Sequence, residues 1–284
     1  MATYIDKMIT NIDACMATPL WRDRLKSDIE AGEVFVSFRA DEIGFYHYNK
    51  LFGYKAANSF TTNRKYAAIL DTPNNDYVTE AQLRDAELVR DFYAGYEQIK
   101  PIVKTYAKPE ALQRMPMIKN FSYANKKNTS PFVVLDVEFG FLGRAGDKSN
   151  VDITLYNKQT REIRFVEVKR LGDDRLKTNE INAQIKKYAD ATRNNRDEIL
   201  AFYTDYIAAA NKMFGLNIPA PTEVCEKIGL LICEFDGVHR DEILRKSNPS
   251  YRACGAAIRE KGDTETLTER TMDSWWKQWN NTTC

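Results

Sequence analysis

The chain has 284 residues, of which 43% are hydrophobic and 29% are charged, and its formal net charge is +1. This composition is typical of a globular protein with one large domain or two small ones, and the near-neutral charge argues against binding polyanions over the whole surface. No run approaches the ~18 to 20 apolar residues that a membrane span requires, and the N-terminus lacks the apolar core of a signal peptide. We therefore expect a cytoplasmic protein with no membrane partner.

Histidine and cysteine usage excludes several kinds of chemistry. The only histidines, His47 and His239, are far apart in the sequence, which argues against a zinc hydrolase, a His-Asn-His nuclease and a histidine-dependent triad. No Gly-x-x-x-x-Gly-Lys-Ser/Thr loop is present, so no ATP-driven motor is expected. The cysteines are scattered and odd in number, so neither a disulfide framework nor a zinc or iron–sulfur centre is predicted. They are Cys15, Cys225, Cys233, Cys254 and Cys284.

The chain begins with a helical pattern and continues with strand-like ones. Residues 5–29 have amphipathic helical spacing, and residues 33–39 alternate as a strand does. Residues 43–55 are predicted to form a hairpin with Asn49 and Lys50 at or near its turn. The hairpin is dense in aromatic residues, which could stack on bases but more commonly pack a small sheet.

A helical region and a polar stretch follow this hairpin. Residues 80–114 have helical spacing, which Pro101 and Pro109 are expected to break. Residues 120–131 are rich in Asn, Lys, Ser and Thr and end in proline, as linkers often do. The sequence therefore predicts an α+β N-terminal module, residues 1–130, to which it assigns no role.

Three strands are predicted after residue 130. Residues 132–141 form an apolar strand in which Asp136 and Glu138 are expected to share a face, because side chains two apart in a strand point the same way. The runs 151–156 and 162–169 alternate apolar and polar residues, and the polar residues between them are typical of a hairpin turn.

The strand pair 151–156 and 162–169 concentrates chemistry at one point. Glu167 and Lys169 are two apart and share a face, and the neighbouring strand can bring Asp152 beside them. Two carboxylates side by side repel each other unless a cation lies between them, and hard oxygen ligands suit Mg²⁺ or Mn²⁺. The other interpretation is an exposed hairpin on which Glu167 and Lys169 form a surface ion pair.

A helix and a fourth strand are predicted next. Thr178 and Asn179 offer an N-cap for a helix over residues 180–190, on which Gln184 and Tyr188 are four apart and share a face. Residues 228–235 form a further apolar strand.

An Asp on one strand followed by Glu-x-Lys on the next resembles the PD-(D/E)xK nuclease superfamily. The resemblance implies that Asp152, Glu167 and the carbonyl of Val168 bind the divalent metal, and that Lys169 orients or activates the attacking water. The proline that often precedes the family's Asp is replaced here by Val151. The resemblance covers roughly residues 131–240.

The helix after these strands narrows the resemblance. Gln-x-x-x-Tyr after Glu-x-Lys is similar to the RecB and lambda-exonuclease type of the superfamily, which implies that Gln184 and Tyr188 line the active site. An acidic residue on the preceding element often completes the metal site in this superfamily. Glu138 is our first choice for that role and Asp136 the second.

Charge is unevenly distributed around the predicted motif. Residues 158–196 contain eleven Lys and Arg against six Asp and Glu, which gives this segment a charge of +5. Cations of this kind either bind phosphates or cover a solvated helix face.

Residues 241–284 are predicted to be a helical tail packed on the core. Trp275, Trp276 and Trp279 lie near its end, and they are expected to attach a terminal helix to the core rather than to stack on bases.

Together these features predict an α/β fold with a restriction-endonuclease-like core at 131–240, built on a mixed, mainly four-stranded sheet flanked by helices. The expected function is metal-dependent hydrolysis of nucleic-acid phosphodiesters, DNA being favoured over RNA, in host defence, restriction or repair. Cutting both strands of a duplex from a single site would imply a homodimer. Two alternatives stay open: a catalytically silent nuclease-like protein used for nucleic-acid binding or assembly, and an unrelated α/β protein.

Overall fold

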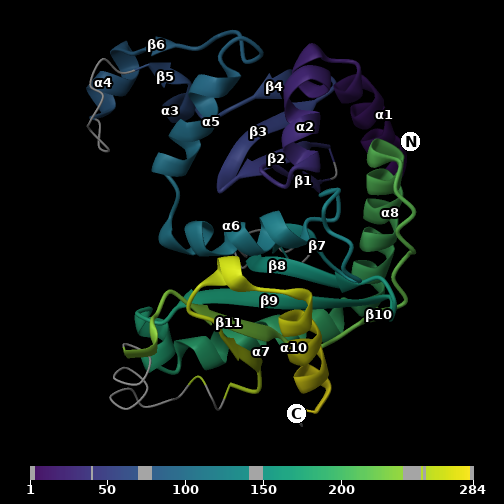
Figure 1. The fold of residues 1–284 in the computed structure, drawn as a ribbon. Coiled ribbons are helices and arrows are strands. Elements are labelled where there is room, and N and C mark those ends of the chain that lie inside the picture. The colour runs from purple at the N-terminus through teal and green to yellow at the C-terminus, as the bar shows by residue number, and fades with distance from the viewer. Residues whose placement is uncertain are drawn as a thin grey trace.

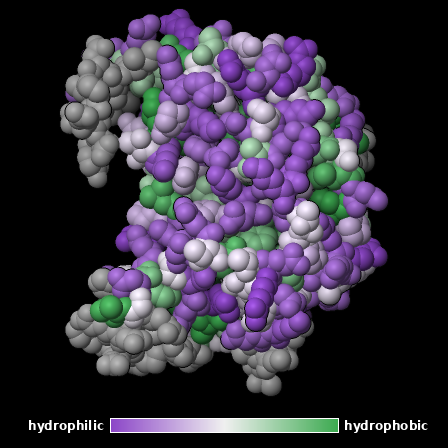
Figure 2. Space-filling view, in the orientation of Figure 1, coloured by the Kyte–Doolittle hydropathy of each residue, from purple (hydrophilic) through white to green (hydrophobic). Residues whose placement is uncertain are grey.

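The computed structural model describes residues 4–39, 41–69, 79–140, 150–238, 251 and 254–281. Over these ranges the protein is a mixed α/β protein with a small antiparallel sheet from its N-terminal part and a larger mixed sheet from the rest (Figure 1). None of the helices in this described part is long and apolar enough to cross a membrane. The face shown in Figure 2 is mostly hydrophilic, with apolar residues scattered over it.

The N-terminal sheet confirms the predicted hairpin. Strand β2 pairs with β3 in antiparallel register, and the chain turns at Tyr48, which has a positive φ of 64°. The predicted helix over residues 5–29 is interrupted between Met16 and Trp21. The elements are α1 (Tyr4–Met16), a π-helical turn (Trp21–Leu25), α2 (Lys26–Glu30), β1 (Phe35–Phe38), β2 (Ile43–His47), β3 (Asn49–Lys55) and β4 (Ser59–Thr61).

The aromatic residues of the hairpin pack this small sheet. Phe45 and Phe52 are fully buried, and both rings contact Phe60. Because buried rings cannot stack on bases, the packing interpretation is confirmed for these two residues.

Short elements and two longer helices lead from the small sheet to the larger one. Pro101 lies inside α5 without ending it, contrary to prediction, because one missing amide donor is tolerated where Ile99 and Val103 are buried against the core. Pro109 begins α6, a position that suits its fixed φ. The elements are α3 (Arg64–Ala67), β5 (Ala68–Ile69), α4 (Glu80–Asp85), β6 (Glu87–Leu88), α5 (Tyr96–Thr105) and α6 (Pro109–Phe121).

The polar stretch predicted as a linker is a packed loop. Ser122 and Asn125 are buried, and the Asn125 amide donates to the carbonyl of Lys119 at 2.7 Å. Core residues before and after this loop form one continuous cluster. The division at residue 130 stays a prediction about independent folding, and the one at residue 240 lies outside the described residues.

The larger sheet has six strands in the described part of the chain, two more than the predicted core. The order is β12-β11-β9-β8-β7, with β10 also paired to β9. β8 is antiparallel to both β7 and β9, and β10, β11 and β12 run parallel to β9. The strands are β7 (Phe132–Gly140), β8 (Asn150–Asn157), β9 (Glu162–Arg170), β10 (Glu223–Val224), β11 (Gly229–Cys233) and β12 (Ala257–Glu260).

The four predicted strands of this sheet are confirmed, except that residue 141 lies outside the described residues. The two additional strands, β10 and β12, were missed because they are two and four residues long and carry no clear alternation. β12 covers the outer edge of β11, all of whose residues are buried. An apolar strand needs such a partner, because an open edge exposes unpaired backbone groups.

Helices cover the larger sheet. Helix α6 lies between the small and the large sheet, and α8 runs beside α1 (Figure 1). The elements after β9 are a 3₁₀ turn (Asp174–Lys177), α7 (Glu180–Asn194), α8 (Arg196–Phe214), a second 3₁₀ turn (Thr264–Thr266) and α10 (Glu269–Asn281). Helix α7 begins at Glu180 as predicted and continues to Asn194, beyond the predicted end at residue 190. Asn179 is the N-cap but its side chain makes no capping hydrogen bond, whereas the Glu180 amide donates to the Thr178 hydroxyl at 3.3 Å.

The terminal helix α10 is held by its tryptophans. Trp275, Trp276 and Trp279 are all buried, and the guanidinium of Arg164 on β9 lies 3.8 Å from the ring centre of Trp276. Arg164 also donates to the carbonyl of Trp276 at 2.9 Å. The expectation that these tryptophans attach the helix rather than bind bases is confirmed.

Candidate active site

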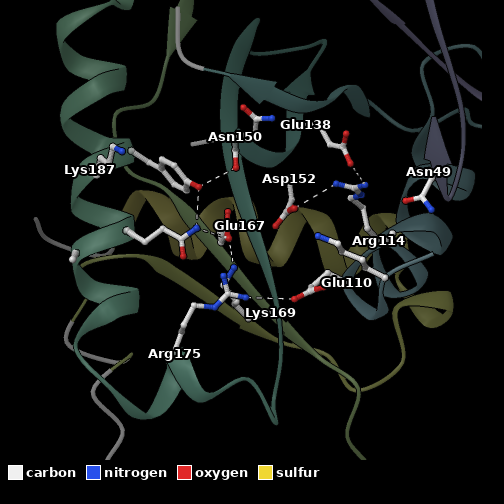
Figure 3. A pocket seen from close by; sticks show the side chains of 15 residues that line it. Asn49, Glu110, Arg114, Glu138, Asn150, Asp152, Glu167, Lys169, Arg175 and Lys187 are labelled. Carbon is white, nitrogen blue, oxygen red and sulfur yellow. Dashed lines mark hydrogen bonds and ion pairs between the residues drawn. The ribbon is translucent and has the colours of Figure 1, made fainter. Parts of the chain in front are cut away.

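The register of two strands brings the predicted carboxylates and lysine together. Ile153 on β8 lies opposite Val166 on β9, and the residues that follow this last pair on the two strands are Asp152 and Glu167. The amide of Val168 donates to Oδ2 of Asp152 at 2.8 Å. The ammonium of Lys169 forms an ion pair with Oε1 of Glu167 (Figure 3).

Helix α7 adds two side chains to this group. The amide of Gln184 donates to Oε1 of Glu167 at 2.8 Å and to the Tyr188 hydroxyl at 2.9 Å. That hydroxyl donates in turn to the carbonyl of Asn150 at 2.9 Å. The two residues can act together because side chains four apart on a helix are neighbours, and the apolar face of α7 fixes them over the sheet through buried Ile185.

These side chains line a cavity of about 820 Å³. Six of the predicted site residues border it: Glu138, Asp152, Glu167, Lys169, Gln184 and Tyr188. The sequence patterns missed further polar residues that border it: Asn49, Lys108, Glu110, Arg114, Asn150, Arg175 and Lys187. Of these, Arg175 and Lys187 fall in the positive segment 158–196, which was the only signal pointing to them.

The positive segment divides between different roles. Lys169, Arg175 and Lys187 border the cavity. Arg164 is buried against the tryptophans of α10, and Arg196 pairs with Glu223 at the surface. Part of the +5 charge therefore surrounds the cavity, and part serves packing and solvation.

Glu167 has unusual electrostatics. It is 3% exposed, and its Oε2 is buried with no hydrogen-bond partner among the described residues. Burial and the neighbouring charge of Asp152 raise the pKa of Glu167 to about 8, although Lys169 and Gln184 oppose the shift. A buried carboxylate oxygen without a partner is costly unless something else binds it.

The two acidic residues of β7 diverge. Asp136 is fully buried and lies outside the cavity, where Ser37 and Arg39 bind it. Glu138 borders the cavity and accepts from Arg114 at 2.7 Å. The expectation that Asp136 and Glu138 share a face is wrong, because the backbone of Glu138 has a positive φ of 52° that interrupts the regular alternation. Asp136 is accordingly excluded as a side chain of this site.

The donor set fits a divalent cation. Asp152 and Glu167 present hard carboxylate oxygens, and burial together with repulsion from Asp152 raises the pKa of Glu167. The Oε2 of Glu167 lacks a partner in the described chain. In the described residues no group of three or more Asp, Glu, His or Cys side chains is arranged to hold a metal ion. Glu138, the predicted third acidic ligand, is instead engaged by Arg114.

No protein-family model matches this chain, and neither a curated protein nor a solved structure matches it. What the site does must therefore be inferred from its own residues.

Proposed function

We propose that this protein is a divalent-metal-dependent nuclease that hydrolyses phosphodiester bonds in nucleic acid, and in DNA rather than RNA. In this proposal β7, β8, β9 and β11, with their flanking helices, are a restriction-endonuclease-like core. One observation carries it: Asp152, Glu167 and Lys169 meet in a cavity, and one of the buried carboxylate oxygens there has no partner in the described chain.

Mg²⁺ or Mn²⁺ would be held by Asp152, Glu167 and the carbonyl of Val168, with Glu138 as a further ligand. When bound, such an ion polarises the phosphate and lowers the pKa of a bound water. The ion would also lower the pKa of Glu167, which is raised in its absence.

The remaining residues bind and orient. The ammonium of Lys169 is buried on the cavity wall, where it can hold the attacking water and offset negative charge that develops on the phosphate. Gln184 fixes Glu167 through the 2.8 Å hydrogen bond, and Tyr188 fixes Gln184. Lys108 and Lys187 border the same cavity, as does Arg175, which pairs with Asp173 and Glu110. These cations would bind neighbouring phosphates.

A cleavage assay tests the proposal. The purified full chain is incubated with linear DNA, circular DNA and single-stranded RNA, in Mg²⁺, Mn²⁺ or EDTA. A Lys169→Ala variant is compared with Lys100→Ala, which removes a lysine that pairs with Asp28 and does not border the cavity. We expect metal-dependent cleavage by the wild type and by Lys100→Ala, and none by Lys169→Ala.

The outcomes separate the interpretations. Cleavage of circular DNA identifies an endonuclease, and cleavage of linear DNA alone identifies an exonuclease. A folded wild type that binds metal and nucleic acid without cutting would instead be a silent, nuclease-like binding protein. A folded wild type that binds no divalent metal would refute the site.

A further inference from the structure

Arg114 links the N-terminal segment to the candidate site. It belongs to α6, which precedes residue 130, and its side chain is 5% exposed at the wall of the cavity. Its guanidinium lies between two carboxylates (Figure 3): Nη2 donates to Glu138 at 2.7 Å, and Nη1 donates to Oδ1 of Asp152 at 3.4 Å.

The guanidinium of Arg114 neutralises the two carboxylates without using all of its hydrogen-bond donors. The bond to Asp152 is long, and the Nε of Arg114 is buried without a hydrogen-bond partner in the described residues. Arg39 offers the contrast: its guanidinium contacts both oxygens of Asp136 and donates to the carbonyl of Val137 at 2.7 Å. Arg114 therefore holds its two carboxylates less completely than Arg39 holds Asp136.

The position of Arg114 has a consequence for the metal ligands. A guanidinium beside Asp152 and Glu138 supplies positive charge where a divalent cation would supply it. The same contact keeps Glu138 engaged away from Glu167, and no three acidic side chains of the described chain are arranged to hold an ion.

We propose that Arg114 is a positioning residue that stands in for the metal: it neutralises Asp152 and holds Glu138 when no cation is bound, and it competes with the cation for them. This inference rests on the proposed function and adds to it a role for the segment before residue 130. That segment contributes the residue that sets how tightly the site binds its metal.

Metal affinity tests this inference without reference to cleavage. Mn²⁺ is titrated calorimetrically into the metal-free full chain, and the melting temperature is measured with Mn²⁺ and with EDTA. Arg114→Gln should bind Mn²⁺ more tightly, on the order of tenfold, because a unit positive charge a few Å from a divalent ion costs about that much affinity even in water-like surroundings. Its melting temperature in EDTA should fall, and Mn²⁺ should raise it by more than in the wild type.

Three control variants test whether the change in Mn²⁺ affinity is specific to the charge of Arg114, or follows from lost packing or from any cation near the cavity. Arg114→Lys keeps the charge and should bind Mn²⁺ nearly as the wild type does. Lys108→Gln removes an exposed cation from the same cavity and should change the affinity by about twofold or less. Arg39→Gln breaks the Asp136 pair outside the cavity, so it should lower stability and leave the affinity unchanged.

Equal or weaker binding by Arg114→Gln, in a wild type that binds and cleaves, overturns this inference and leaves the proposed nuclease intact. Binding by neither protein overturns both. Tighter binding by Arg114→Gln supports the inference whether or not the wild type cleaves, and cleavage then judges the nuclease separately.

Discussion

Two buried carboxylates of the larger sheet behave differently. Asp136 accepts hydrogen bonds on both oxygens, from Ser37, Arg39 and the Val137 amide on Oδ1 and from Arg39 and Tyr203 on Oδ2. The partners of Glu167 crowd onto Oε1, and its Oε2 has none in the described chain. Burial raises the pKa of both carboxyl groups, so burial alone does not distinguish them.

What distinguishes them is the missing partner and the cavity. A carboxylate whose oxygens are all bonded stabilises one arrangement of the chain, whereas one with an unpartnered oxygen beside a cavity is poised to bind something. Asp136 therefore serves the fold, and Glu167 is the carboxylate on which the proposed function depends. The predictions that follow test that assignment.

The largest expected effect is on activity. Glu167→Gln keeps the shape of the side chain and removes its charge, so cleavage should fall by about 10³-fold or more. Its stability in EDTA at neutral pH should change little, because a carboxyl group with a pKa of about 8 is mostly protonated there and the neutral amide resembles that form. Steady-state cleavage rates and urea unfolding measure the two effects, and a Glu167→Gln enzyme with wild-type turnover would remove Glu167 from the mechanism.

The matching change at Asp136 should affect stability instead. Asp136→Asn deprives Arg39 of its counter-charge and disturbs the bonds to Ser37 and Tyr203. The free energy of unfolding should fall by about 3 kcal/mol, as when one partner of a buried pair is removed. Turnover per folded molecule, with the folded fraction measured by circular dichroism, should stay within about twofold of wild type. A larger loss of turnover per folded molecule would show that Asp136 takes part in the reaction.

The pH dependence of stability sharpens the comparison. Because the pKa of Glu167 rises to about 8 in the folded state, the folded protein binds more protons than the unfolded one between the ordinary value of 4.5 and about 8. The contribution of Glu167 to stability is therefore fully present below pH 4.5 and is lost as the pH rises from there through about 8, by up to about 5 kcal/mol. Urea unfolding in EDTA at several pH values measures this slope.

The slope can be assigned to Glu167 by mutation and by metal. Asp152, Lys169 and Arg175 are charged groups that interact with it, and all three remain in Glu167→Gln. Glu167→Gln should flatten the slope, and saturating Mn²⁺ should flatten it in the wild type. An unchanged slope in Glu167→Gln would assign the pH dependence elsewhere, with Asp136 the first candidate because its pKa is raised too.

Local sequence patterns predicted the residues that meet around Glu167 and missed most of the other residues that border the cavity. Period-two alternation gave the strands that carry Asp152 and Glu167, and helical spacing placed Gln184 beside Tyr188. Each relation joins residues that are close in sequence or paired across one hairpin.

The missed features depend on tertiary packing. Arg114 reaches Asp152 from another part of the chain because α6 packs on the larger sheet, and no local pattern encodes that contact. The positive φ of Glu138 and the register shift between Val134 and Asp136 interrupt the alternation of side chains along β7. The sequence pattern alone does not reveal either irregularity. The short β12 is defined by its pairing with β11 rather than by its own sequence.

The smallest predicted effect concerns the support of Glu167 from α7. Tyr188→Phe removes a hydroxyl that accepts from Gln184 and donates to the carbonyl of Asn150. Losing this support should cost about 1 kcal/mol of stability and at most tenfold in turnover, because Gln184 keeps its bond to Glu167. Gln184→Ala removes that bond too and should lower turnover further without changing KM. If Tyr188→Phe were as inactive as Glu167→Gln, the Tyr188 hydroxyl would contact the substrate itself. Helix α7 would then contribute a catalytic residue and not only the support of Glu167.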